Sequence, residues 1–377
     1  MNTKYANLFD SFTFRNGVTV KNRVVMSPMT TWASNDDYTL SDAEEKYYRR
    51  RVNDVGLVIT GCTHVQPNGI GFTHEFAGYD DTFLQSLRKL ADAAKSGGAP
   101  AILQVFHAGN KALPHLIPDG KAVSASAVQT EDSLFAPALM PRELTQDEII
   151  EVIHAFGETT RRAIEAGFDG VEIHGAHGFL IQNFFSPFTN RREDQWGGSL
   201  ENRMHFPLAI LAEMKKVIDK HASKPFILGY RISLEEPGEG ALRIKDSYQL
   251  IDRLIEEGID YVHASLPNAL SSKPIDSQDD QTYLELVAEH INERVPFLAA
   301  GSMRTPEDVS TALDKGLTLG AIGQALVMDP EWLEKVENGN ESEIVQTLKK
   351  STISQIDIPE KLWTLIQSMG PWFPIED

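Results

Sequence analysis

Two histidines stand three residues apart at the end of a short β-forming run. The run covers residues 170–174 and continues as Gly-Ala-His-Gly-Phe, so His174 and His177 lie at its end. Side chains alternate along a strand, so Glu172 and His174 should face the same side. Two imidazoles at one strand end exceed what packing requires, and we expect them to contact a ligand. A buried Glu172 needs a partner, and Arg231 on the next expected strand is the candidate.

Other apolar runs also end in polar residues or glycines. Gln104 stands within one run and His107 follows it directly. Two later runs each end in glycine before a helical stretch, where free backbone N–H groups bind anions. The residues at these two ends are Gly301, Ser302, Gly323 and Gln324. Barrel proteins often bind phosphate at this place, so the pattern predicts a phosphate site.

The elements that must position these residues follow a regular rhythm. Eight short apolar or β-branched runs alternate with stretches of helical periodicity. The expected strands are 24–26, 56–60, 101–106, 170–174, 226–232, 261–264, 296–300 and 320–323. Such alternation predicts parallel strands, and eight repeats favour a closed (β/α)₈ TIM barrel of the α/β class. The alternative, a doubly wound sheet, would carry a Gly-x-Gly-x-x-Gly turn that this chain lacks.

Three additions to the barrel are expected. Residues 12–20 alternate around an Asn-Gly pair, which predicts an N-terminal β-hairpin plug. The stretch 108–144, rich in Pro, Ala and Ser, follows the third strand and should form a lid at the catalytic face. Residues 336–377 should form a C-terminal helical extension of a core at about 20–335. No linker interrupts the chain, so we expect residues 1–377 to form a single domain.

Composition excludes several classes of function. The chain has 377 residues, a formal net charge of −19 and one cysteine, Cys62. The charge disfavours nucleic acid and anionic membranes as partners. A single cysteine excludes an internal disulfide and a cysteine-ligated iron–sulfur cluster. The N-terminus carries no apolar signal core and no run of about 18 apolar residues occurs, so we expect a cytoplasmic protein. Homo-oligomer formation is left open.

Four segments together resemble the old yellow enzyme family, in its single-domain bacterial ene-reductase form. Ser27-Pro-Met-Thr30 is similar to the first flavin-contact segment of that family, and residues 104–109 to its third-strand motif. Residues 170–180 resemble its histidine-pair signature, and residues 190–203 its most recognisable loop. The segments occur in the family's order, with similar spacing, from about residue 7 to about residue 335.

The resemblance implies non-covalently bound FMN and a ping-pong reaction. NADH or NADPH would reduce FMN, and an electron-poor small molecule such as an α,β-unsaturated carbonyl compound would then take the hydride. His174 and His177 would be the catalytic pair that binds the substrate oxygen, while Trp32 and Phe179 would line the substrate pocket. The implied FMN contacts are Ser27, Pro28, Met29, Thr30, Gly61, Gln104, Arg231, Gly301, Ser302, Gly323 and Gln324.

Three residues depart from the family pattern. Phe179 stands where a tyrosine usually gives a proton to the substrate, Gln324 where an arginine usually binds the phosphate, and Trp32 where related bacterial enzymes often place tyrosine. Without the tyrosine hydroxyl, another proton donor must act, or the barrel binds flavin with a degenerate or different activity.

Two other barrel chemistries are considered. A metal-dependent hydrolase could use an imidazole cluster formed by His107, His174, His177 and His263. The first expected strand carries no ligand pair, and the last ends in Gly-Gln, so we expect no metal. A Schiff-base lyase needs a lysine at a strand end, and the expected strand ends carry none.

Overall fold

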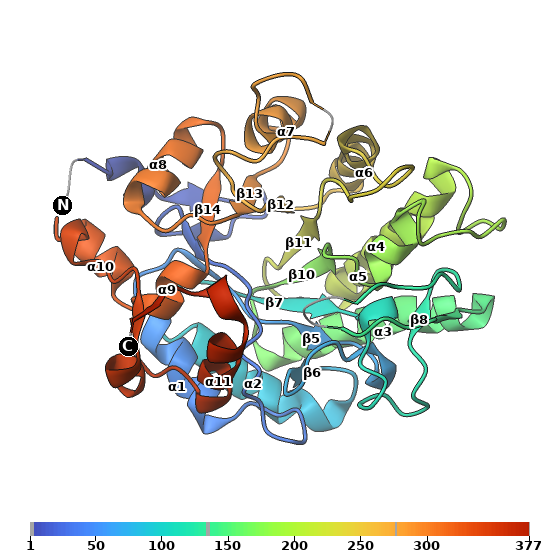
Figure 1. Ribbon diagram of the computed structural model, residues 1–377, viewed down its shortest axis with the longest axis horizontal. Helices are drawn as coiled ribbons and strands as arrows, with labels where there is room; N and C mark the ends of the chain where they lie inside the picture. The colour runs from blue at the N-terminus through green and yellow to red at the C-terminus, as the bar shows by residue number, and fades with distance from the viewer. Residues whose placement is uncertain (1–3, 133–135, 276, 377) are drawn as a thin grey trace.

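Eight parallel strands form a closed ring in the order in which they occur along the chain (Figure 1). The computed structural model describes residues 4–132, 136–275 and 277–376. The ring consists of β3 (Val24–Met26), β4 (Leu57–Ile59), β7 (Ala101–Phe106), β10 (Gly170–Gly175), β11 (Ile227–Ile232), β12 (Tyr261–Ser265), β13 (Phe297–Ala300) and β14 (Leu319–Ile322). Pairing of β14 with β3 closes it. The expected TIM barrel is confirmed, and the bounds of each strand differ from expectation by one residue or less.

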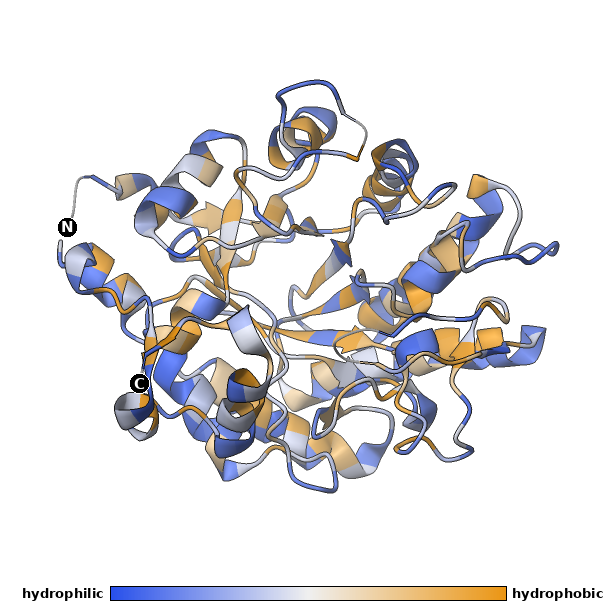
Figure 2. Cartoon of the chain, viewed as in Figure 1, coloured by the Kyte–Doolittle hydropathy of each residue, from blue (hydrophilic) through white to orange (hydrophobic). Residues whose placement is uncertain are grey.

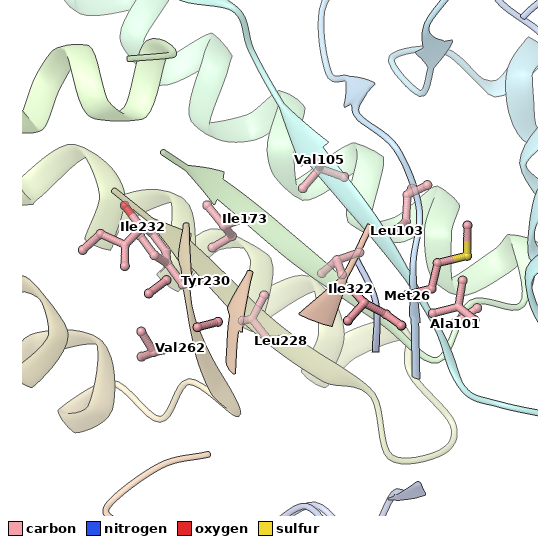
Figure 3. Close-up of a cluster of buried hydrophobic side chains, with 14 of the residues drawn as sticks. Met26, Ala101, Leu103, Val105, Ile173, Leu228, Tyr230, Ile232, Val262 and Ile322 are labelled. Carbon is pink, nitrogen blue, oxygen red and sulfur yellow. The ribbon is translucent and has the colours of Figure 1, made fainter. Parts of the chain in front are cut away.

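Alternation along the strands separates an outer apolar layer from the barrel interior. Val171 and Ile173 of β10 belong to the layer between strands and helices, part of which Figure 3 shows. Glu172 points the other way, and it contacts side chains of β7 and β12 inside the barrel. The period of two therefore decides which residues of each strand can reach a ligand.

Helices surround the ring and carry both hydrophobic and hydrophilic stripes (Figure 2). They are α1 (Asp42–Arg51), α2 (Leu84–Ala94), α3 (Gln146–Ala166), α5 (Leu200–His221), α6 (Ile244–Glu256), α7 (Tyr283–Ile291) and α8 (Pro306–Asp314), with the shorter α4 (Leu180–Phe185) and α9 (Gln324–Met328) near the barrel mouth. Ser41, Thr145 and Thr305 begin three of them with capping boxes, as their sequences predict. No helix in the described ranges is long and apolar enough to cross a membrane.

The N-terminal hairpin closes the end of the barrel opposite the strands' carboxyl ends. β1 (Phe12–Thr13) pairs antiparallel with β2 (Thr19–Val20), and Gly17 has φ +91° in the turn. Phe14 and Val20 are buried in a cluster with residues from the beginnings of the barrel strands, such as Leu57 and Leu319. The predicted plug is confirmed.

The insertion after the third barrel strand reaches the mouth of the barrel. It contains η4 (Gly109–Lys111) and the parallel pair β8 (Val123–Ser124) and β9 (Arg142–Glu143). Residues 128–132 and 136–137 of this insertion line the cavity described below. Residues 133–135 of the predicted lid lie outside the described residues.

The C-terminal segment packs on its own barrel beside α1 and α9. It contains α10 (Trp332–Glu337), α11 (Glu360–Ser368) and a parallel strand pair, β15 (Leu348–Lys349) with β16 (Ile375–Glu376), so it is not wholly helical. Arg51 of α1 donates through Nη2 to the carbonyl oxygen of Ile356 at 2.6 Å. Phe373 is buried in the same apolar cluster as the barrel strands. The division into a core and an extension remains a prediction.

Candidate active site

A cavity of about 1110 Å³ opens at the carboxyl ends of the barrel strands. Pockets for one small ligand measure about 300–1,000 Å³, so this cavity has room for a flavin and a second molecule. The predicted site residues in its lining are Pro28, Met29, Thr30, Trp32, Gln104, His174, His177, Phe179 and Arg231. The others do not line the cavity and lie at neighbouring strand ends or just beyond them: Ser27, Gly61, Gly301, Ser302, Gly323 and Gln324.

The two histidines meet at the end of β10, with ring centroids 4.9 Å apart. The backbone N–H of Ala176 donates to His174 Nδ1 at 3.3 Å, so we assign the proton of the neutral His174 ring to Nε2. Burial, reinforced by neighbouring cationic groups, lowers the pKa of both histidines well below 6.5. His174 therefore brings an uncharged N–H donor to the cavity at pH 7.

Ser265 joins His177 to Arg231. Arg231 donates through Nη2 to Ser265 Oγ at 3.1 Å, and the same Oγ lies 2.6 Å from His177 Nε2. A guanidinium can only donate, so the serine oxygen accepts from it and its hydroxyl hydrogen is available to Nε2. We therefore assign the His177 proton to Nδ1. Sequence reasoning missed Ser265 because it ended the strand at 264, one residue early.

Aromatic side chains form the walls beside the histidines. The ring of Phe179 lies edge-on to His174, with centroids 4.9 Å apart, and is 5 % exposed. Trp32 lies edge-on to Phe72 at 5.2 Å and to Trp372 of the C-terminal tail at 5.9 Å. Two of the departures from the family pattern, Phe179 and Trp32, thus lie in the cavity wall.

Lys111 brings a positive charge into the same wall. Its Nζ donates to the carbonyl oxygen of His177 at 2.6 Å and lies 5.8 Å from the centroid of Phe179. Burial lowers the pKa of Lys111. No carboxylate of the described chain forms an ion pair with it at 4 Å or less. Inspection of strand ends missed Lys111, because it lies five residues beyond β7 in η4.

The expected ion pair between Glu172 and Arg231 is wrong. Glu172 accepts hydrogen bonds from Gln104 Nε2 at 2.7 Å, Tyr261 Oη at 2.9 Å and His263 Nδ1 at 2.8 Å. These donors satisfy both carboxylate oxygens, which leaves Arg231 to bond Ser265 instead. Burial raises the pKa of Glu172, but His263, the charge of Arg231 and Gln104 outweigh it and lower the pKa overall.

The residues predicted to bind phosphate lie close together at the ends of β13 and β14. A Cβ atom on Gly301 would lie 2.7 Å from the Leu266 carbonyl oxygen, and one on Gly323 would lie 2.7 Å from Met29 Sδ. Gln324 accepts a hydrogen bond from Arg304 Nη2 at 2.6 Å. Sequence reasoning missed Arg304, since it follows the strand end by four residues.

Three predicted site residues have strained backbones. Trp32, His177 and Ser302 have φ angles of +49°, +60° and +51°, a region that residues with a side chain rarely adopt. Such conformations cost about 1–3 kcal/mol and gather at functional sites. Three of the eight described non-glycine residues with positive φ are thus predicted site residues.

The hydrolase alternative does not fit this geometry. Within the described ranges, no three His, Cys, Asp or Glu side chains lie close enough to hold a metal. His107 is engaged by the Gly109 N–H and by Asn68, while His263 faces Glu172.

Residues 7–343 match the sequence model of the NADH:flavin oxidoreductase / NADH oxidase family. The chain belongs to this family. It is 42% identical over 377 residues to the probable NADH-dependent flavin oxidoreductase YqiG of Bacillus subtilis (strain 168), and the match covers both chains completely. It is 36% identical over 372 residues to the NADH:fumarate oxidoreductase of Klebsiella pneumoniae (strain 342), a match that covers 97% of this chain and 40% of that protein.

Solved structures of two reductases share the fold. A 2-naphthoyl-CoA reductase complex superposes with a TM-score of 0.80 at 25% identity, covering 90% of this chain and 53% of that one. Morphinone reductase in complex with tetrahydroNAD superposes with a TM-score of 0.77 at 23% identity and covers 98% of both chains, a likeness that shows the fold. The resemblance to the old yellow enzyme family is confirmed: this NADH:flavin oxidoreductase family member is an NAD(P)H-dependent enzyme with FMN as cofactor.

The residues of this barrel end fit FMN. Arg231 lines the cavity, and its Nε is buried without a hydrogen-bond partner in the described chain. Gln104 also lines the cavity, and its hydrogen bond to Glu172 orients its side chain. A Cβ atom on Gly61 would lie 2.7 Å from the Met29 carbonyl oxygen, so the ends of β3 and β4 need glycine to approach this closely. A guanidinium with an unused Nε–H, beside strand ends that require glycine, suits the polar edge of a flavin.

Proposed function

We propose that this enzyme reduces the carbon–carbon double bond of a small α,β-unsaturated carbonyl compound with reducing equivalents from NADH or NADPH. The observation that carries the proposal is the neutral His174, which brings an Nε2–H donor to a cavity that also holds His177 and Arg231. Bound FMN would supply the hydride-transfer chemistry between the nicotinamide and the substrate. We assign FMN binding to Gln104 and Arg231 at the ring and to the ends of β3, β13 and β14 elsewhere.

His174 and His177 would bind the substrate oxygen. Donors fixed in advance stabilise the negative charge that develops on that oxygen when the β-carbon gains hydride. The hydrogen bond from Ala176 to His174 and that from Ser265 to His177 fix both ring orientations. A neutral ring suits this role, because one nitrogen accepts the hydrogen bond that orients the ring while the other presents an N–H donor.

Lys111 would supply the proton that Phe179 cannot. Its ammonium group lies against the segment from His177 to Phe179, where the family's tyrosine would stand. Burial lowers its pKa, which brings an ammonium closer to the acidity that general acid catalysis requires. The proton would pass from Nζ to the substrate α-carbon and be replaced from solvent.

Anaerobic steady-state turnover with NADH and a simple enone tests the proposal. We expect one NADH to be oxidised for each saturated ketone formed. A barrel with degenerate or different activity would oxidise NADH only when oxygen is present and leave the enone unchanged, which would refute the proposal. We also propose that residues 1–377 work as a single domain and that the protein is cytoplasmic.

A further inference from the structure

Gln324 uses both polar atoms of its side chain on other protein groups. Its Oε1 accepts from Arg304 Nη2 at 2.6 Å, and its Nε2 donates to the carbonyl oxygen of Trp372 at 2.6 Å. Gln324 is also neutral, whereas the family commonly has an arginine at this position. In this chain the glutamine holds an arginine that comes from another loop.

Arg304 lies on the first of the two loops that form the phosphate site of many barrels. It follows β13 and precedes α8, while Gln324 begins α9 directly after β14. Its backbone N–H donates to Asp308 Oδ2 at 3.0 Å and its carbonyl oxygen accepts from Trp332 Nε1 at 2.8 Å. The backbone of Arg304 is thus anchored on both sides, and its side chain extends toward Gln324.

The guanidinium of Arg304 retains unused donors. Its Nε is buried and has no hydrogen-bond partner, and no carboxylate of the described ranges forms an ion pair with it at 4 Å or less. The nearby Asp308 bonds the backbone N–H groups of Arg304 and Thr305 with the same Oδ2 atom. A buried guanidinium N–H without a partner is unfavourable unless an acceptor such as an anion completes its hydrogen bond.

We propose that Arg304 supplies the positive charge that binds the FMN phosphate, and that Gln324 is the positioning residue that holds Arg304 in place. The positive charge that the family commonly has at position 324 is provided in this chain by Arg304, on the loop after β13. With Arg304 in this place, an enzyme without the family's arginine can still hold a phosphorylated flavin.

Competition between FMN and riboflavin tests the inference, because riboflavin lacks only the phosphate. The holoenzyme is equilibrated with mixtures of both flavins, and the bound flavins are separated and quantified. For Arg304→Gln we expect the preference for FMN over riboflavin to fall about 10- to 100-fold, as loss of a charge-assisted bond predicts. Arg49→Gln, which removes an exposed charge on α1, should leave the preference unchanged.

Two further variants keep the test decisive. Arg304→Gln combined with Gln324→Arg should regain most of the preference, because a guanidinium returns to the phosphate. If Arg304→Gln does not fold, Arg304→Lys keeps the charge and should preserve a marked preference. An unchanged preference in Arg304→Gln, or an equal loss of both flavins, would overturn the inference.

Discussion

Lys111 Nζ lies 2.6 Å from the carbonyl oxygen of His177, and this hydrogen bond places an ammonium group beside Phe179 at the active site. We therefore expect Lys111→Met to lower kcat with enones about 100-fold, the smaller end of the range for general acid catalysis. The rate at which NADH reduces the enzyme should be the same in this variant as in the wild type. Rapid-reaction measurements of the two half-reactions separate these effects.

Phe179→Tyr provides the complementary variant. A tyrosine hydroxyl at this position should raise kcat on simple enones and should restore turnover to Lys111→Met. Lys121→Met, at an exposed lysine of the insertion, is the matched control and should behave as wild type. Failure of the tyrosine to rescue Lys111→Met, with fold and flavin content intact, would argue against a proton-donor role for Lys111.

His174→Ala should weaken the binding of phenols. A phenolate oxygen placed near the flavin would accept the His174 Nε2–H, so removal of this donor should cost about 10-fold or more in affinity. Titration of the flavin absorbance with a para-substituted phenol measures the dissociation constant. His154→Ala removes a solvent-exposed imidazole on α3 and serves as control. Equal phenol affinities in all three proteins would remove His174 from the oxygen-binding role.

Carboxylates in the cavity lining should favour NADH over NADPH. The lining includes Glu131, Asp132, Glu235 and Glu236. NADPH carries an additional phosphate, which these charges repel, whereas the rest of the two nucleotides is the same. Glu131→Gln with Asp132→Asn should raise kcat/KM for NADPH relative to NADH about 3- to 10-fold. Asp219→Asn, on the outer side of the barrel, should leave the ratio unchanged, and an equal ratio in both variants would contradict this electrostatic account.

Protein stability should decrease as the pH falls below about 6.5. Burial lowers the pKa of five histidines, namely His64, His107, His174, His177 and His263. The unfolded chain binds protons at these histidines near pH 6.5 while the folded protein does not, so acidification favours unfolding. Burial raises the pKa of Glu44 to about 7, of Asp260 to about 6 and that of Glu75 well above 4.5, and these groups act in the opposite direction.

The histidines with lowered pKa values outnumber the carboxyls with raised ones, so unfolding should take up protons overall. The thermal midpoint of the FMN-saturated enzyme should therefore be lower at pH 5.5 than at pH 7.5. Differential scanning calorimetry at constant ionic strength measures it. A constant or higher midpoint at pH 5.5 would mean that the buried histidines gain protons in the folded protein.

The barrel could be predicted because its strands are buried on both faces and read as continuous apolar runs. The same pattern placed His174 at a strand end and Glu172 in the interior, where both lie. The partner of Glu172 could not be chosen from spacing, since inward residues of every strand compete for it. Tyr261 and His263, two residues apart on β12, both reach its Oε2 atom, whereas Arg231 does not.

Residues on loops were harder to find. Lys111 and Arg304 lie four or five residues beyond their strands, and only the folded path of each loop brings them to His177 and Gln324. Gln324 looked like the loss of a phosphate-binding charge because sequence shows the missing arginine but not its replacement. When a residue on one loop takes the role of a residue on another loop, the spacing of a single sequence gives no sign of it.

Anaerobic absorption spectroscopy of the purified enzyme tests the central claim most directly. Addition of NADH without oxygen should bleach the visible band of the bound flavin, and a stoichiometric amount of an α,β-unsaturated ketone should then restore it. A band that neither NADH nor NADPH bleaches, or that only oxygen restores after bleaching, would contradict the assignment of this cavity as an ene-reductase active site.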